Sequence, residues 1–245
     1  MASAAPTVTL NAAAVPIPKN LLAPHSRAWP HTGDMAGAGA ELEASFTIQG
    51  TEDAGLPNPL RRVVIYLPKG TTINTHGFAT CHPRLSGWSR TGPPCPSSSL
   101  ASTTGQETDM VNFAGQGIVS SPRAHGAFFP AGGGLGFWTH TTGGPFVSGG
   151  FNTGSLMPTA GAYGAKLTEN LPLQTAVGPW DLSTTSLDLT LGAAYMKGGK
   201  LHTIVTMPKT CPAGGLPVKA ELSFGAGAQP TWEAITLASK EPCRK

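Results

Sequence analysis

The sequence predicts an all-β protein built as an antiparallel β-sandwich of the jelly-roll or immunoglobulin-like kind, with Gly- and Pro-rich loops. Three observations lead to this fold class. The 245 residues include 32 Gly and 23 Pro, which interrupt helices. Short segments rich in β-branched residues alternate apolar and polar side chains, and turn signals separate them at the spacing typical of sandwiches. Apolar residues make up 40% of the chain, enough to build a core, whereas charged residues make up only 12%, which argues against a coiled coil.

Strands are expected in the N-terminal half wherever an apolar or alternating segment ends at Gly or Pro. Residues 7–10 begin the chain as one such strand. Residues 41–49 alternate with period two, as a strand with one buried face does. Residues 60–67 are more uniformly apolar and stop at a Pro-Lys-Gly turn, which indicates a buried strand. The segment from 78 to 105 is rich in Pro, Ser and Thr and is expected to be a loop.

The C-terminal half combines a glycine-rich block with clearer strand signals. Residues 113–165 contain dense Gly among aromatic residues, which favours tight hairpins whose burial comes from the rings. Further strands are expected at 186–191, 201–207, 216–224 and 231–237, with a Lys-Gly-Gly-Lys turn before the second of them. These four strands predict an antiparallel meander or two hairpins.

The expected domain organisation is one sandwich with an N-terminal extension. Residues 1–40 contain the first strand and a Pro-rich extended segment, and residues 41–245 form the sandwich domain. Residues 41–120 and 121–245 are candidate halves of that domain. Residues 1–6 have neither the basic segment nor the apolar run of a signal peptide, and we expect them to be the start of a mature secreted chain behind an added Met.

Four cysteines, at positions 81, 95, 211 and 243, permit three disulfide pairings. We expect the local pairing of Cys81 with Cys95 and of Cys211 with Cys243, because each pair bounds a segment flanked by Pro. Free core thiols are the alternative, and the spacing lacks the Cys-x2-Cys pattern of zinc sites. Two bridges would indicate an oxidising compartment, so the chain is expected to be secreted or at the cell surface.

The net charge of +3 arises from scattered basic and acidic residues. This weak, dispersed charge argues against nucleic-acid binding and against binding to an anionic membrane. The sequence also lacks an apolar run of eighteen residues, so no membrane span is expected.

Several segments together resemble a known family. They are residues 64–71, 77–81, 92–96, 207–212, 220–224 and 242–243. In this combination the chain, from about residue 7 onward, resembles a family of uncharacterised secreted, disulfide-bridged β-rich proteins common in actinobacterial genomes. The resemblance implies secretion and the two local disulfides, and it supplies no catalytic residue. The chain departs from the family in the glycine-aromatic block at 126–154 and in His25 and His31.

Two histidines flank the glycine-aromatic block and are candidate metal ligands. A hairpin turning at 132–134 would place His125 and His140 near each other on paired strands. Such a pair binds copper or zinc if a third ligand comes from elsewhere. The alternative is that both histidines are ordinary strand residues. For the chain as a whole we expect no cofactor.

Three tryptophans, Trp29, Trp88 and Trp138, are candidate ligand-binding residues. Exposed aromatic rings on a sandwich stack on sugars or pack against a polymer or a partner, although they also cover loops over a sheet. The nucleophile pattern Gly-x-Ser-x-Gly is absent. We therefore expect a non-enzymatic extracellular or cell-envelope module that serves as a surface, adhesive or structural binding protein through self-association or contact with a cell surface or polymer. A secreted hydrolase acting on a polymer and a His-based metal-binding protein are the alternatives.

Overall fold

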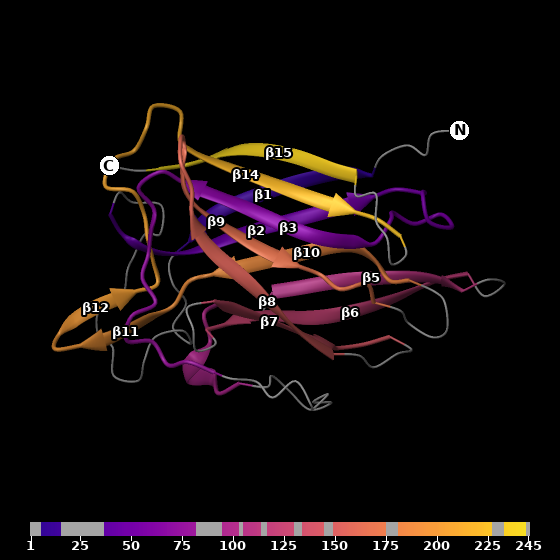
Figure 1. The fold of residues 1–245 in the computed structure, drawn as a ribbon, viewed down its shortest axis with the longest axis horizontal. Coiled ribbons are helices and arrows are strands. Elements are labelled where there is room, and N and C mark those ends of the chain that lie inside the picture. The colour runs from indigo at the N-terminus through magenta and orange to yellow at the C-terminus, as the bar shows by residue number, and fades with distance from the viewer. Residues whose placement is uncertain are drawn as a thin grey trace.

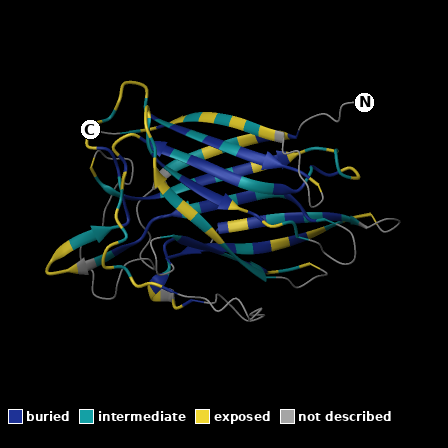
Figure 2. Cartoon of the chain, in the orientation of Figure 1, coloured by how far each residue is buried: buried dark blue, intermediate teal, exposed yellow. Residues whose placement is uncertain are grey.

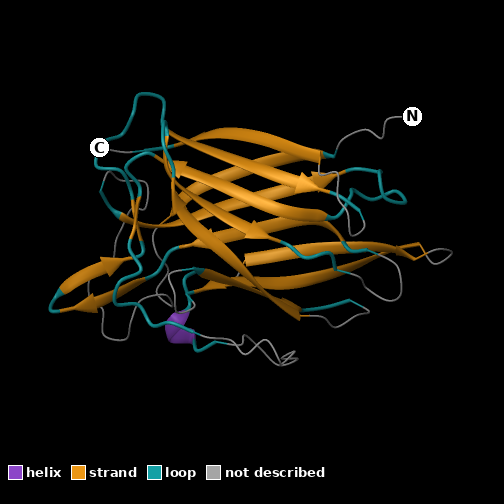
Figure 3. Ribbon diagram, in the orientation of Figure 1, coloured by secondary structure: helices purple, strands orange, loops and turns teal. Residues whose placement is uncertain are grey.

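The computed structural model consists almost entirely of antiparallel strands (Figures 1 and 3). It describes residues 6–15, 37–81, 95–102, 105–113, 117–129, 134–144, 149–174, 181–226 and 233–243. The predicted all-β antiparallel fold with two disulfides is confirmed.

In the described residues, one short 3-10 helix stands among the strands. Their bounds are β1 Thr7–Val15, β2 Gly39–Gln49, β3 Leu60–Pro68, β4 Thr72–Ile73, the 3-10 helix Ser97–Ser99, β5 Gly105–Phe113, β6 Gly117–Phe128, β7 Leu135–Thr141, β8 Gly149–Pro158, β9 Tyr163–Asn170, β10 Ser183–Leu191, β11 Ala194–Lys197, β12 Lys200–Thr203, β13 Val205–Thr206, β14 Leu216–Phe224 and β15 Glu233–Glu241.

One large sheet contains most of these strands, in the order β15-β14-β3-β9-β8-β7-β6-β5-β10-β2-β13-β4, with β1 also paired to β2. Its centre is a five-strand meander from β5 to β9. The sheet folds over so that its halves face each other across one core, to which β2, β3, β6, β7, β9, β10 and β14 all contribute buried side chains. β1, which branches from β2, lies beside the end strand β15 and is not paired to it.

The predicted strands form, but two of them pair differently from the expected meander. The 186–191 segment, within β10, pairs with β2 and β5. The Lys-Gly-Gly-Lys turn instead joins β11 to β12 in a separate small hairpin. The expected 201–207 strand is divided, because the chain bends at the fully buried Ile204 and β13 continues beside β2 and β4. The last hairpin, β14 and β15, forms as expected.

The N-terminal strand is an integral part of the sheet. β1 pairs with β2 along its whole length, from Thr7 opposite Gln49 to Val15 opposite Glu41, while residues 16–36 lie outside the described residues. The sheet does not divide at residue 120, because β3 lies between β9 and β14, and β10 lies between β5 and β2.

Both local disulfides form. The Cα atoms of Cys81 and Cys95 lie 5.7 Å apart, and those of Cys211 and Cys243 lie 5.4 Å apart. Two disulfides indicate an oxidising environment. Within the described ranges, no helix has the length and apolar character needed to cross a membrane.

Burial alternates along the strands, as Figure 2 shows in bands of dark blue alternating with teal or yellow. On β14, for example, the alternate residues from Leu216 to Phe224 are buried. The inward faces are not uniformly apolar, because Arg123, Asp109 and Glu169 are also almost completely buried. The interior therefore contains an apolar region and a charged region.

Candidate functional site

The two candidate metal ligands lie on opposite faces of the sheet. His125 is opposite Thr139, and His140 is opposite Ala124, so the register differs by one residue from the one that would pair the histidines. A shift of one residue turns a side chain to the other face. His125 points inward and stacks on Phe137, with 5.7 Å between ring centroids, whereas the His140 ring stacks on Trp138. In the described part of the chain, no group of three His, Cys, Asp or Glu side chains could hold a metal ion.

Trp138 is half-buried on the outward face of the meander. It packs beside Phe128 and the Cys81–Cys95 disulfide in a small apolar cluster outside the main core. Trp138 thus packs against the disulfide itself. Trp29 and Trp88, together with His25 and His31, lie outside the described residues.

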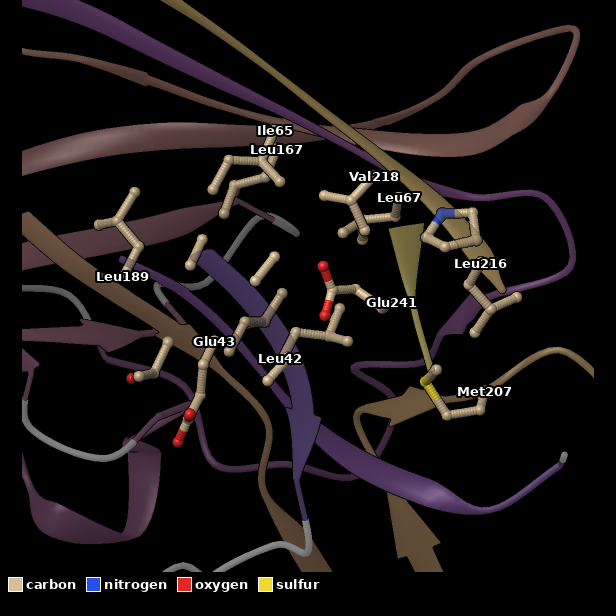
Figure 4. Close-up of a pocket in the computed structure, with 16 residues that line it drawn as sticks. Leu42, Glu43, Ile65, Leu67, Leu167, Leu189, Met207, Leu216, Val218 and Glu241 are labelled. Carbon is tan, nitrogen blue, oxygen red and sulfur yellow. The ribbon is translucent and has the colours of Figure 1, made fainter. Parts of the chain in front are cut away.

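The first interior site is an apolar pocket between the two halves of the sheet. It holds about 560 Å³ of space, including the part open to solvent. Side chains from β1, β2, β3, β9, β10 and β14 line it, and Figure 4 shows them converging. Its labelled lining residues are Leu42, Glu43, Ile65, Leu67, Leu167, Leu189, Met207, Leu216, Val218 and Glu241.

Small residues account for the space in the apolar pocket. Ala12 and Ala13 of β1 and Ala44 of β2 are among the lining residues, as are the longer side chains of Ile65 and Leu167. A methyl group fills much less of the interior than a Leu side chain does, so the facing leucines and isoleucine leave a gap. The alanine-rich sequence of β1 thus shapes the pocket.

One carboxylate points into the apolar pocket. Glu241, at the end of β15, lies opposite Leu216 and is 8% exposed. Its Oε1 accepts a hydrogen bond of 2.8 Å from Ser239 Oγ. Figure 4 shows the Glu241 carboxylate between Val218 and Leu42, whereas the Glu43 carboxyl points away from them. Glu241 lines the pocket together with Glu43 and Thr190, although the surface of the pocket is almost entirely apolar.

The second interior site is a charged cluster formed by Glu107 and Asp109 of β5, Arg123 and His125 of β6, and Glu169 of β9. None of these five residues is more than 5% exposed. On β5 and β6 the members are two residues apart, so both side chains of each strand point to the same face. Glu107 lies directly opposite Arg123 in the register.

Ion pairs compensate two of the three carboxylates of the charged cluster. Arg123 Nε lies 3.0 Å from Asp109 Oδ2, and Arg123 Nη1 donates a hydrogen bond to Gln174 Oε1. His125 Nε2 lies 3.5 Å from Glu169 Oε1. Burial opposes protonation of His125, but the carboxylates of Glu169 and Glu107 outweigh it and raise the pKa of the imidazole.

Glu107 is the third carboxyl and is held in its protonated form. Thr184 Oγ1 donates a 2.8 Å hydrogen bond to Asp109 Oδ1 and lies 3.4 Å from Glu107 Oε1. The single hydrogen of the Thr184 hydroxyl thus serves both carboxyl groups, and the shorter hydrogen bond goes to Asp109. Burial, with a contribution from the neighbouring Asp109, raises the pKa of Glu107 to about 8. Glu107 is thus mostly neutral at pH 7.

The charged cluster borders a smaller pocket, which we call the acid pocket. It holds about 290 Å³ of space, again including the part open to solvent. Glu107, Asp109, Thr184 and Gln174 line it on the polar side. Its apolar lining residues are Pro59, Leu60, Leu171, Pro172 and Leu182. The acid pocket therefore presents a buried acid beside an apolar wall.

Sequence reasoning did not identify Glu107, Arg123, Glu169 or Glu241. Acidic residues at alternate positions are typical of a strand's solvent face, so Glu107 and Asp109 gave no signal of burial. The glycine-aromatic block drew attention to His125, and the structure does place that residue in the charged cluster, with Glu169 as its neighbour.

Comparison with protein-family models, with curated proteins and with solved structures finds no match to this chain.

Proposed function

We propose that this chain is a secreted, non-enzymatic binding module whose apolar pocket takes an aliphatic molecule with a hydrogen-bond-donating head group. The apolar pocket lies in the interior between the sheet halves, where binding sites for small apolar ligands commonly occur in β-proteins. The two disulfides support an extracellular location.

The Glu241 carboxylate is the observation that carries this proposal. Leucine, isoleucine and valine side chains supply apolar surface, and burying an alkyl chain against them contributes about 25 cal/mol per Å². Glu241 accepts one hydrogen bond from Ser239 and retains further acceptor capacity for a hydroxyl group. A ligand with a carboxylate head group would be repelled at this position.

The geometry favours binding over hydrolysis of a polymer. Clustered carboxylates line the acid pocket, which is the feature that a hydrolase would need. Glu107 and Asp109 are, however, only 5% and 2% exposed, and Asp109 is already paired with Arg123. A polymer chain has no access to such groups, and a paired carboxylate is a poor general base.

The test is a titration with 1-hexanol and with hexanoate, followed by methyl NMR. We expect 1-hexanol to shift the methyl signals of Leu42, Leu189 and Val218, and hexanoate to bind at least tenfold more weakly. The substitution Glu241→Gln should reduce this discrimination, because the repelling charge is lost.

A cavity-filling substitution provides the matched control. Ala12→Leu should fill the apolar pocket and abolish the hexanol shifts, whereas Ala238→Leu, at an exposed position of β15, should leave them unchanged. Equal binding of hexanol and hexanoate, or hexanol shifts that persist in Ala12→Leu, would contradict the proposal.

A further inference from the structure

The charged cluster contains one carboxyl group more than it contains cationic side chains. Asp109 is paired with Arg123, and Glu169 faces His125. Glu107 is left with no countercharge of its own. A buried charge without a partner is strongly unfavourable, so Glu107 must either hold a proton or meet a cation.

Glu107, like Glu169, has an unused acceptor, and of the two only Glu107 lines the acid pocket. Its Oε2 is buried and has no hydrogen-bond partner among the described residues. Glu107 lines the acid pocket and is 5% exposed. Leaving such a group unsatisfied is unfavourable, so a ligand that supplies a donor at this point gains a hydrogen bond that the free protein lacks.

We propose that the acid pocket is a second ligand site, which takes the ammonium group of a small alkylamine with Glu107 as its carboxylate partner. The alkyl part would lie against Leu60, Leu171 and Leu182, which form the apolar wall. This site is separate from the apolar pocket, and the inference stands whether or not that pocket binds a ligand.

The arrangement of donors and acceptors selects an ammonium group over other ligands. An anion would face the carboxyl groups of Glu107 and Asp109. A metal ion would need several free oxygen ligands, but Asp109 is held by Arg123 and Thr184. A guanidinium group pairs best with both oxygens of one carboxylate, whereas Glu107 Oε1 already contacts Thr184. One free oxygen suits an ammonium group.

Binding at this site is coupled to release of a proton. The groups that face Glu107 are Asp109 on its own strand, Arg123 and His125 on β6, and Glu169 on β9. The free site holds a proton on Glu107 at pH 7. When an alkylammonium ion binds, Glu107 releases its proton to the solvent. The ion pair of Glu107-COO⁻ with R-NH₃⁺ then replaces Glu107-COOH.

The test is isothermal titration calorimetry of the whole chain carrying Ala12→Leu, which fills the apolar pocket, with n-butylamine hydrochloride as the ligand and n-butanol as the neutral ligand of matched shape. At pH 7, titrations in two buffers of different ionisation enthalpy should show release of nearly one proton per amine bound. Because Glu107 has a pKa of about 8, the affinity should rise nearly tenfold from pH 6 to pH 7. Equal affinity for n-butanol, or binding without proton release, would overturn the proposal.

Two matched variants separate this site from the apolar pocket. Glu107→Gln preserves the size and donor of the protonated acid, so it should fold, as thermal unfolding will verify, and should lose more than tenfold in affinity for n-butylamine. In the Ala12→Leu background, in which the apolar pocket is filled, Glu241→Gln should leave n-butylamine binding unchanged. If Glu107→Gln binds n-butylamine as tightly as the chain with Glu107 does, the proposed amine site is wrong. The hexanol titration tests the apolar pocket independently.

Discussion

The apolar pocket and the charged cluster occupy the same interior, and the boundary between them falls within single strands. On β9, Leu167 lines the apolar pocket, and Glu169, the next inward-facing residue, belongs to the cluster. The region of the apolar pocket is stabilised by burial of apolar surface, and its side chains do not fill all of the space between them. The charged cluster is stabilised by ion pairs, and one of its acids, Glu107, has no cationic partner. Alternation decides which side chains face inward, but it does not decide the chemistry of the inward face.

The largest expected effect is loss of the central cation of the charged cluster. Arg123 is fully buried and contacts both Asp109 and Gln174. Arg123→Ala leaves a buried carboxylate without its partner, so we expect the free energy of unfolding to fall by about 3 to 5 kcal/mol. Urea unfolding monitored by circular dichroism measures this change.

An exposed cation and a double substitution provide the controls for Arg123. Lys240→Ala, on the exposed side of β15, should change stability by less than about 0.5 kcal/mol. Combining Arg123→Met with Asp109→Leu should cost less than Arg123→Ala alone, because no unpaired charge remains. A loss below about 1 kcal/mol for Arg123→Ala would show that the two regions do not differ as we describe.

The next effect is a loss of stability with rising pH. The pKa of Glu107 is raised from 4.5 to about 8 in the folded chain, and that of His125 is also raised. The folded state therefore binds more protons than the unfolded state over this range, and the stabilising contribution present at low pH is lost as the pH rises. We expect the free energy of unfolding to fall by on the order of 3 kcal/mol between pH 5 and pH 8.

Urea unfolding at several pH values tests this direction, and Glu107→Gln identifies its source. The variant cannot titrate at position 107, so its stability should decline much less over the same interval. The Glu241→Gln variant of the apolar pocket should retain the wild-type pH dependence. A wild-type stability that stays constant or increases from pH 5 to pH 8 would refute the assignment of Glu107 as a neutral acid.

Sequence patterns identified seven strand segments and both disulfides, but not the bounds of the strands in the meander from β5 to β9, which strands pair or what the interior contains. The 41–49 and 216–224 segments were predicted because alternation is a local property. The pairing of β10 with β2 and β5 depends on contacts distant in the sequence, and the proposed histidine pair failed because a hairpin register one residue away reverses the face. Glu107 and Asp109 stand at alternate positions, as acidic residues on a solvent-facing strand do. Their burial becomes visible only in the folded structure, where other strands cover them.

The smallest expected effect concerns packing beside the apolar pocket. Leu189 is 4% exposed and borders space that is already empty, so its side chain has fewer neighbours to lose than a leucine packed on all sides. We expect Leu189→Ala to cost about 2 to 3 kcal/mol, near the lower limit for this substitution. Leu222→Ala, at a fully buried position that does not line the pocket, is the matched control and should cost about 4 to 5 kcal/mol. Urea unfolding gives both values, and equal losses at the two positions would mean that the apolar region is packed as tightly as the rest of the core.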